Sequence, residues 1–214
     1  MAPSRLPEFV ASLRSLCTDP TFTVKDVPAV FDAEALASIK RTIKSIPMTA
    51  MEMHEINRFG RLIVHDLPEF TELQRALTAR VSGLVGEEAE PSYNFLCLYT
   101  RMGVCEPHLD APSAKWTLDV CIDQSEPWPI HFSQIVPWPE NGVELGDDWQ
   151  TAIKSSPDFK FQSKVLTPGD GIVFSGSSQW HYRDPLPQTG AKSFCDLLFF
   201  HYIPKGTSEL VKPR

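Results

Sequence analysis

The sequence predicts a mainly β fold, a double-stranded β-helix (jelly roll) with N-terminal helices packed on its outside. Short strand-like segments dominate from Tyr93 onward, and turns rather than helices separate them. Hydrophobic residues make up 42% of the 214, which is enough to bury a core, and the length fits one domain. We expect a single domain over residues 1–214, with 1–90 as helical support and 91–204 as the jelly-roll core.

Three helices are expected in the N-terminal support. Residues 6–17 and 32–46 have helical patterns; Asp32 is suited to cap the second, and Pro47 follows its end. A strand ("RLIVHDL") comes before the third helix, over residues 69–85. That helix repeats apolar side chains at helical spacing, namely Phe70, Leu73, Leu77, Val81 and Leu84.

The core is expected to consist of short strands joined by turns, of which "TPGDG" is the clearest. Residues 124–160 form a long segment with three of the five tryptophans, which we interpret as an insertion covering the mouth of the barrel. The expected strands are "YNFLCLYT", "WTLDVCID", "WPIHF", "FKFQSKVL", "GIVFSG", "QWHYR" and "SFCDLLFFHYI".

Composition excludes several functional classes. No run of eighteen apolar residues and no apolar leader are present, so neither a membrane span nor a secretory signal is expected. The five cysteines are an odd number without a C-x-x-C pair, which indicates a reducing compartment, and we expect a cytoplasmic protein. A net charge of −7 argues against nucleic acid as a partner.

The segment "YTRMGVCEPHLDAP" contains the candidate metal ligands His108 and Asp110. Residues i and i+2 of a strand share a face, so both side chains point the same way. A third ligand would complete a facial triad of two histidines and one carboxylate, which leaves iron positions open. His131, His181 and His201 are the alternatives; His181 is best placed, at the start of the strand after the "PGDGIVFSG" hairpin.

Two stretches carry a family resemblance. "Y-x-x-x-G-x-x-E-P-H-x-D", from Tyr99 to Asp110, resembles the metal-binding strand of the iron(II)/2-oxoglutarate-dependent dioxygenases, and is closest to their prolyl 4-hydroxylase-like branch. "H-Y-R-D-P-L-P-Q-T-G-A-K-S-F", from His181 to Phe194, resembles the second half of that pattern. The resemblance covers about residues 93–203.

The resemblance implies a role for each matching residue. His108, Asp110 and His181 would bind Fe(II), with 2-oxoglutarate and O₂ at the open positions. Lys192 would hold the distal carboxylate of 2-oxoglutarate, because a buried carboxylate needs a cation. Arg183 is the alternative, since on a regular strand it shares the face of His181. The hydroxyl of Tyr99 would reach the same co-substrate; a packed strand tyrosine is the alternative.

Asp196 and Trp116 are candidate substrate contacts. Asp196 lies in an otherwise apolar strand, where a carboxylate faces solvent or has a function. Trp116 begins the strand "WTLDVCID", whose face of Trp116, Leu118, Val120 and Ile122 we expect to point inward. A purely structural role is the simpler interpretation of both residues.

The sequence thus predicts an Fe(II)/2-oxoglutarate-dependent oxygenase that oxidises an unactivated C–H of a small molecule, giving succinate and CO₂. A protein hydroxylase of the same fold, a cupin-type metal enzyme without 2-oxoglutarate, and a non-catalytic binding barrel remain alternatives. A nucleic-acid demethylase is disfavoured, because an R-x-N-x-T-x-R signature is absent after His181.

Overall fold

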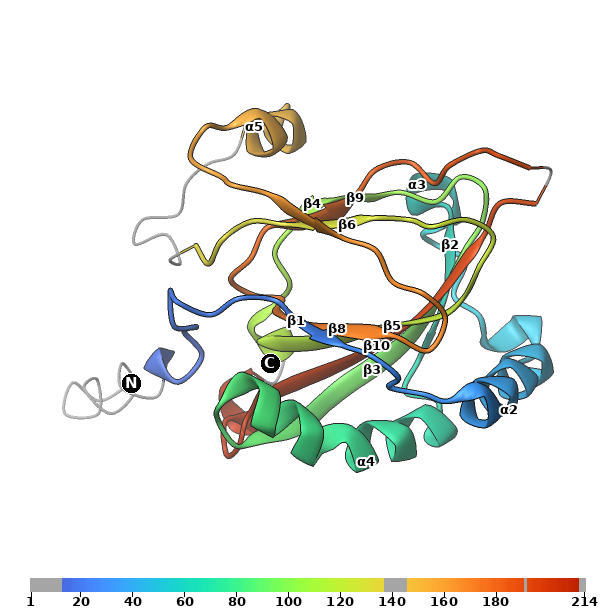
Figure 1. Ribbon diagram of the computed structural model, residues 1–214, viewed down its shortest axis with the longest axis horizontal. Helices are drawn as coiled ribbons and strands as arrows, with labels where there is room; N and C mark the ends of the chain where they lie inside the picture. Colours follow the sequence, from blue (N-terminus) through green and yellow to red (C-terminus); the bar gives the residue numbers. More distant parts are fainter. Residues whose placement is uncertain (1–12, 137–145, 191, 212–214) are drawn as a thin grey trace.

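Two antiparallel sheets face each other in the computed structural model, which describes residues 13–136, 146–190 and 192–211 (Figure 1). The larger sheet has the order β1-β8-β5-β10-β3-β2, and the smaller one has the order β4-β9-β6-β7. The chain alternates between the sheets as a jelly roll requires, so the predicted fold class is confirmed.

Most strands lie in predicted segments, but β1 was not predicted and β7 is much shorter than the segment "FKFQSKVL". In the larger sheet they are β1 Lys25–Val27, β2 Arg61–His65, β3 Ala89–Tyr99, β5 Trp116–Gln124, β8 Gly171–Ser175 and β10 Cys195–Pro204. In the smaller sheet they are β4 Cys105–His108, β6 Ile130–Phe132, β7 Gln162–Lys164 and β9 His181–Arg183.

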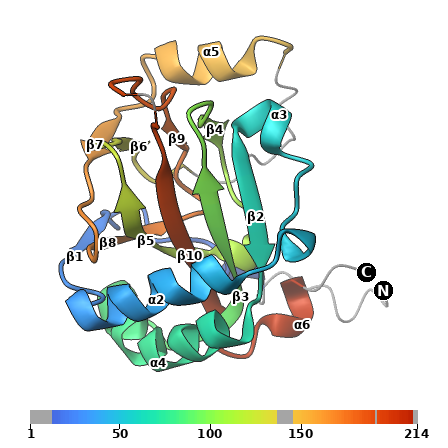
Figure 2. The same ribbon diagram turned by 90° about the vertical axis from the view of Figure 1, so that its right-hand side faces the viewer.

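Helices cover the outer face of the larger sheet. Figure 2 shows α2 (Ala33–Ser45) and α4 (Pro68–Val85) on this side, whereas α5 (Trp149–Ser155) lies at the opposite end of the molecule. The side chain of Asp32 accepts from the Ala35 amide at 2.9 Å, which confirms the predicted cap of α2. Short helical turns complete the chain: η2 Met48–Ala50, α3 Ile56–Phe59, η3 Pro112–Ala114 and α6 Ser208–Val211.

The larger sheet is therefore buried on both faces. On its helix side, a core packs side chains of β5 and β10 against α2 and α4; the strand residues are Trp116, Leu118, Val120, Ile122, Leu198, Phe200 and Tyr202. On its other side, a second core fills part of the space between the sheets. The face of β5 that was expected to point inward thus faces the helices, and this expectation was wrong.

Residues 124–160 are not simply an insertion, because part of them belongs to the barrel itself. They include β6, a central strand of the smaller sheet, and the buried Trp128, whose Nε1 donates to the Asp184 carbonyl at 2.7 Å. Trp138 lies outside the described residues, as does most of the helix expected over 6–17. Within the described residues, no helix is long and apolar enough to cross a membrane.

Candidate metal centre

Strands β4 and β9 bring the three predicted metal ligands together. His108 is paired in register with His181, and the amide of Asp110 donates to the Gly176 carbonyl at 2.8 Å. One ligand atom from each of the three residues lies within 4.8 Å of the others. Asp110 Oδ1 is 3.4 Å from His108 Nε2 and 3.7 Å from His181 Nε2. The three side chains therefore converge on one point between the strands.

Backbone carbonyls fix the orientation of both imidazoles. His108 Nδ1 lies 2.8 Å from the Glu106 carbonyl, and His181 Nδ1 lies 2.9 Å from the Gln179 carbonyl. Because a carbonyl only accepts, each Nδ1 carries a proton, so Nε2 is the nitrogen that holds the free lone pair when the ring is neutral. Metal-binding histidines are commonly held in this way.

The charges within the triad suit a divalent cation. Burial, together with the neighbouring His108, lowers the pKa of His181 to about 4, so its Nε2 is unprotonated near neutral pH. Burial alone would raise the pKa of Asp110, but His181 and His108 outweigh it and keep the group ionised. Burial alone would lower the pKa of His108, but Cys105 and Asp110 outweigh it and the pKa is raised. The ring therefore favours a proton on Nε2 as well, and a bound cation would displace this proton.

A cavity of about 200 Å³, here called the inner pocket, adjoins the triad between the two sheets. Arg183 and Tyr99, both predicted for 2-oxoglutarate, line it. The inner pocket is lined by the triad together with Arg61, Tyr93, Phe95, Tyr99, Cys105, Thr117, Ile130, Phe174, Arg183, Phe199 and His201.

Two arginines supply positive charge to the inner pocket. Arg183 is buried; its Nη2 donates to Asp119 Oδ2 at 2.7 Å and its Nη1 donates to the Trp128 carbonyl. Arg61 Nη1 donates to the Tyr99 hydroxyl at 2.8 Å, and Arg61 also pairs with Glu55. The sequence did not indicate Arg61, because only the register of β2 on β3 places it opposite Tyr99.

Three predicted residues lie away from the inner pocket. Lys192 is exposed, in the loop before β10, and is not among the described residues that line it. Trp116 faces the helices and donates to Glu87. Asp196 pairs in register with Asp123, and these carboxylates lie near Lys40 of α2. Alternation along β10 turns Asp196 away from the pocket, so its expected position and that of Trp116 are corrected.

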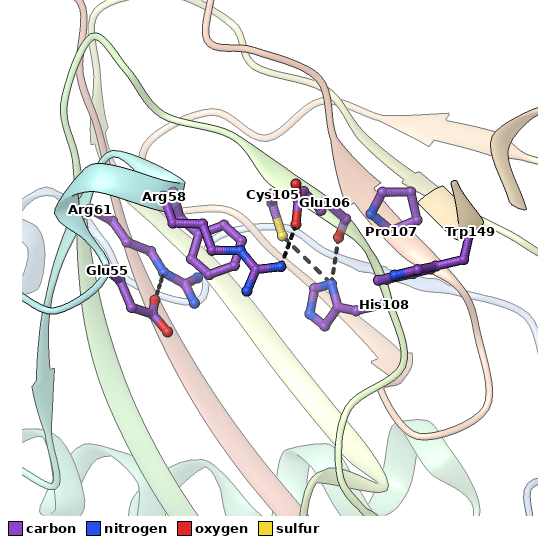
Figure 3. Close-up of a pocket in the computed structure, with 9 residues that line it drawn as sticks. Glu55, Arg58, Arg61, Cys105, Glu106, Pro107, His108 and Trp149 are labelled. Carbon is purple, nitrogen blue, oxygen red and sulfur yellow. Dashed lines mark hydrogen bonds and ion pairs between the residues drawn. The ribbon is translucent and has the colours of Figure 1, made fainter. Parts of the chain in front are cut away.

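A second cavity of about 250 Å³, here called the outer pocket, lies on the solvent side of His108 (Figure 3). It shares Arg61, Cys105 and His108 with the inner pocket. The His108 side chain is 38% exposed, against 16% for Asp110 and 5% for His181, so the triad opens toward this side. The remaining lining residues are Glu55, Arg58, Phe59, Glu106, Pro107 and Trp149.

The two histidines that were alternative third ligands lie elsewhere. His131 stacks on Tyr182, and its Nδ1 lies 2.7 Å from Ser163 Oγ. His201 lines the inner pocket, but its Nδ1 lies 3.0 Å from Thr117 Oγ1. Neither belongs to the described group of residues that could hold a metal ion.

A jelly roll that holds two histidines and a carboxylate, with open space beside them, is the arrangement used by non-haem iron oxygenases. No protein-family model and no curated protein matches the sequence. Several solved structures do match the fold of this chain.

HygX from Streptomyces hygroscopicus, in a structure with nickel and 2-oxoglutarate bound, has a TM-score of 0.64 at 13% identity, over 96% of this chain and 88% of that one. The non-heme alpha ketoglutarate dependent carbocyclase SnoK from nogalamycin biosynthesis has a TM-score of 0.67 at 10% identity, over 97% and 90%. An oxidoreductase of the 2OG-Fe(II) oxygenase family from Burkholderia pseudomallei has 0.53 at 15%, over 92% and 89%. At these identities the likeness establishes the shared fold.

Proposed function

We propose that this chain is an Fe(II)/2-oxoglutarate-dependent oxygenase acting on a small molecule. The observation that carries the proposal is the triad itself: the Nε2 atoms of two imidazoles and one ionised carboxylate converge beside a pocket lined by two arginines. These donors fit a divalent iron, which prefers imidazole nitrogen and carboxylate oxygen and keeps three positions open in this geometry. When bound, iron with 2-oxoglutarate and O₂ supplies the oxidation of an unactivated C–H, giving succinate and CO₂.

In this proposal the protein binds 2-oxoglutarate between the triad and Arg183. Arg183 lies two residues beyond His181 on β9, roughly 6–7 Å along a strand. That separation suits a five-carbon diacid with one carboxylate at the metal and the other at a guanidinium. Asp119 already neutralises much of the charge of Arg183, so the Tyr99 hydroxyl and Arg61 complete the anion site.

Arg183 replaces Lys192 as the proposed partner of the distal carboxylate. A planar guanidinium has enough donors to hold Asp119, the Trp128 carbonyl and a further carboxylate together. The lysine at the position implied by the resemblance is exposed in a loop. The prolyl 4-hydroxylase-like branch stays a prediction.

The prime substrate is proposed to bind in the outer pocket, beside the exposed edge of His108. The pocket offers the Trp149 indole as an apolar surface, and polar groups in the ion pair between Arg58 and Glu106 at 3.1 Å. Its volume suits a small molecule or one ring of a larger one. A related fold supports this class of substrate, because HygX has been solved with hygromycin B bound.

The test is an aerobic screen of small metabolites with Fe(II) and 2-oxoglutarate, in which succinate and oxidised product are both measured. We expect succinate formation to require Fe(II), 2-oxoglutarate and O₂, and to rise when one substrate is present. His108→Ala is the control without a complete triad. Metal binding without consumption of 2-oxoglutarate would indicate a cupin-type enzyme, and no metal binding would indicate a non-catalytic barrel. A parallel peptide panel tests the protein hydroxylase alternative.

A further inference from the structure

The two carboxylate oxygens of Asp110 have different surroundings. Oδ1 faces the Nε2 atoms of His108 and His181. Oδ2 accepts a hydrogen bond from Thr117 Oγ1 at 3.2 Å. A Cβ placed on Gly176 would overlap Oδ2, so this oxygen also packs closely against backbone. The carboxylate is therefore held at Oδ2, while Oδ1 faces the two histidines.

The hydrogen bond between His201 and Thr117 has a defined direction. Its Nδ1 lies 3.0 Å from Thr117 Oγ1, and both groups are buried. A hydroxyl has one proton, and the ionised Asp110 only accepts, so Thr117 donates to Asp110 and must accept from His201 Nδ1–H. Burial lowers the pKa of His201 to about 4, which agrees with a neutral ring that carries its single proton on Nδ1.

Aromatic packing fixes the His201 ring in this orientation. Tyr93 stacks on it with ring centroids 4.3 Å apart, and Phe95 lies at 5.2 Å. The other ring nitrogen, Nε2, is buried and has no hydrogen-bond partner among the described residues. The ring is thus held by one polar bond, the bond to Thr117.

We propose that Thr117 and His201 are positioning residues that hold Asp110 Oδ2 and so direct Oδ1 alone to the metal. The chain of hydrogen bonds runs from His201 through Thr117 to Asp110, across three different strands or loops. This arrangement confines the carboxylate to one coordination position, which leaves the remaining positions for co-substrate and O₂. The inference rests on the proposed metal site.

Two substitutions of Thr117 isolate the hydroxyl. Thr117→Val removes it with almost no change in shape, and Thr117→Ser keeps it. Calorimetric titration of the purified apoprotein with Mn²⁺ measures the metal Kd without turnover, and the absorption spectrum of the Co²⁺ form reports its coordination. We expect Thr117→Val to raise the Kd about 10- to 100-fold and to change the spectrum, as loss of such supporting bonds commonly does. Thr117→Ser should stay close to wild type.

A matched pair at His201 tests the second link. The side-chain amide nitrogen of His201→Asn can occupy the place of Nδ1, whereas His201→Phe keeps the stacking but has no donor. We expect His201→Asn to bind Mn²⁺ nearly as wild type does, and His201→Phe to bind more weakly. If Thr117→Val does not fold, the two His201 variants still test whether the hydrogen-bond chain supports metal binding.

The inference is overturned if folded Thr117→Val retains the wild-type Kd and Co²⁺ spectrum, or if Thr117→Val and Thr117→Ser lose affinity equally. Equal Kd values for His201→Asn and His201→Phe would remove the role of His201. Failure of the proposed function appears separately, in wild type: a wild-type protein that binds no Mn²⁺ refutes the metal site and this inference with it.

Discussion

The two faces of the larger sheet differ sharply in chemistry although both are buried. Along β5, the helix-facing side chains are Trp116, Leu118, Val120 and Ile122, while Thr117, Asp119 and Cys121 face the smaller sheet. Along β10, the buried Phe200 faces the helices and His201 faces the inner pocket. The outer face supplies apolar burial, and the inner face supplies the polar groups that chemistry needs. Stability and activity should therefore respond to different substitutions on the same strands.

The largest expected effect is on the inner side, at the triad. His108→Ala should reduce 2-oxoglutarate turnover below detection, because the metal would lose one of its three proposed ligands. The unfolding free energy should change by about 1 kcal/mol or less, since the side chain is half-exposed. Succinate formation and urea denaturation measure the two effects. Full turnover with a normal fold would show that His108 is no ligand.

On the outer face, a substitution should lower stability and leave metal binding intact. Phe200 is fully buried between the sheet and the helices, so Phe200→Ala should cost about 3–5 kcal/mol in unfolding free energy. The folded fraction should still bind metal, because the side chain points away from the triad. Urea denaturation measures the unfolding free energy, and Mn²⁺ titration at low temperature measures the metal affinity of the folded protein. A loss of metal affinity without loss of stability would contradict the division between the faces.

The inner pocket should distinguish Arg183 from Lys192. Arg183→Lys keeps a charge beside Asp119 but cannot hold Asp119 and a second carboxylate in one planar fork. Losing one charge-assisted hydrogen bond, worth about 1.5–3 kcal/mol, should raise the KM for 2-oxoglutarate roughly 10- to 100-fold. Lys192→Ala is the control and should leave this KM unchanged. A raised KM for Lys192→Ala and an unchanged KM for Arg183→Lys would instead assign the distal carboxylate to Lys192, as the family resemblance implies.

The smallest expected effect concerns the carboxylate of Asp196, a polar exception on the outer face. Burial and the nearby Asp123 raise its pKa to about 7, against the opposing effect of Lys40. The folded protein therefore keeps a proton that the unfolded chain releases near pH 4, so stability falls as the pH rises from about 4 to the folded pKa near 7 and then levels off. Asp196→Asn should remove this fall and stabilise the protein at pH 8 by about 1 kcal/mol or more. Parallel stability curves for wild type and variant between pH 5 and 8 would contradict this.

The jelly roll and the convergence of the triad were predictable because both depend on local patterns. The sequence spacing brought His108 and Asp110 close together, although β4 ends at His108 and Asp110 lies in the loop that follows. The chain crosses from β8 in the larger sheet to β9 in the smaller sheet, where His181 pairs with His108. That these three residues bind iron stays a prediction. The faces of β5 were assigned the wrong way round because apolar residues were taken to point at the barrel interior. Helices bury the other face, so the polar members of the strand were the better guide to the pocket.

The remaining site residues depend on long-range register. Arg61 and Glu55 reach the site from the N-terminal part, and no local pattern indicates that β2 extends the sheet beside Tyr99. The network through Thr117 and His201 joins residues that are far apart in sequence. Lys192 was misplaced because sequence spacing does not determine the path of a loop, and this one leaves the lysine exposed.

The boundary that the two pockets share has a consequence for the order in which the proposed ligands would bind. Arg61, Cys105 and His108 line both cavities, so we expect a molecule in the outer pocket to restrict access to the inner pocket. On the proposed assignment of the two pockets, 2-oxoglutarate would then have to bind before the prime substrate, and the oxidised product would leave before succinate. Excess prime substrate would inhibit the reaction, because it would occupy the outer pocket before the co-substrate had entered.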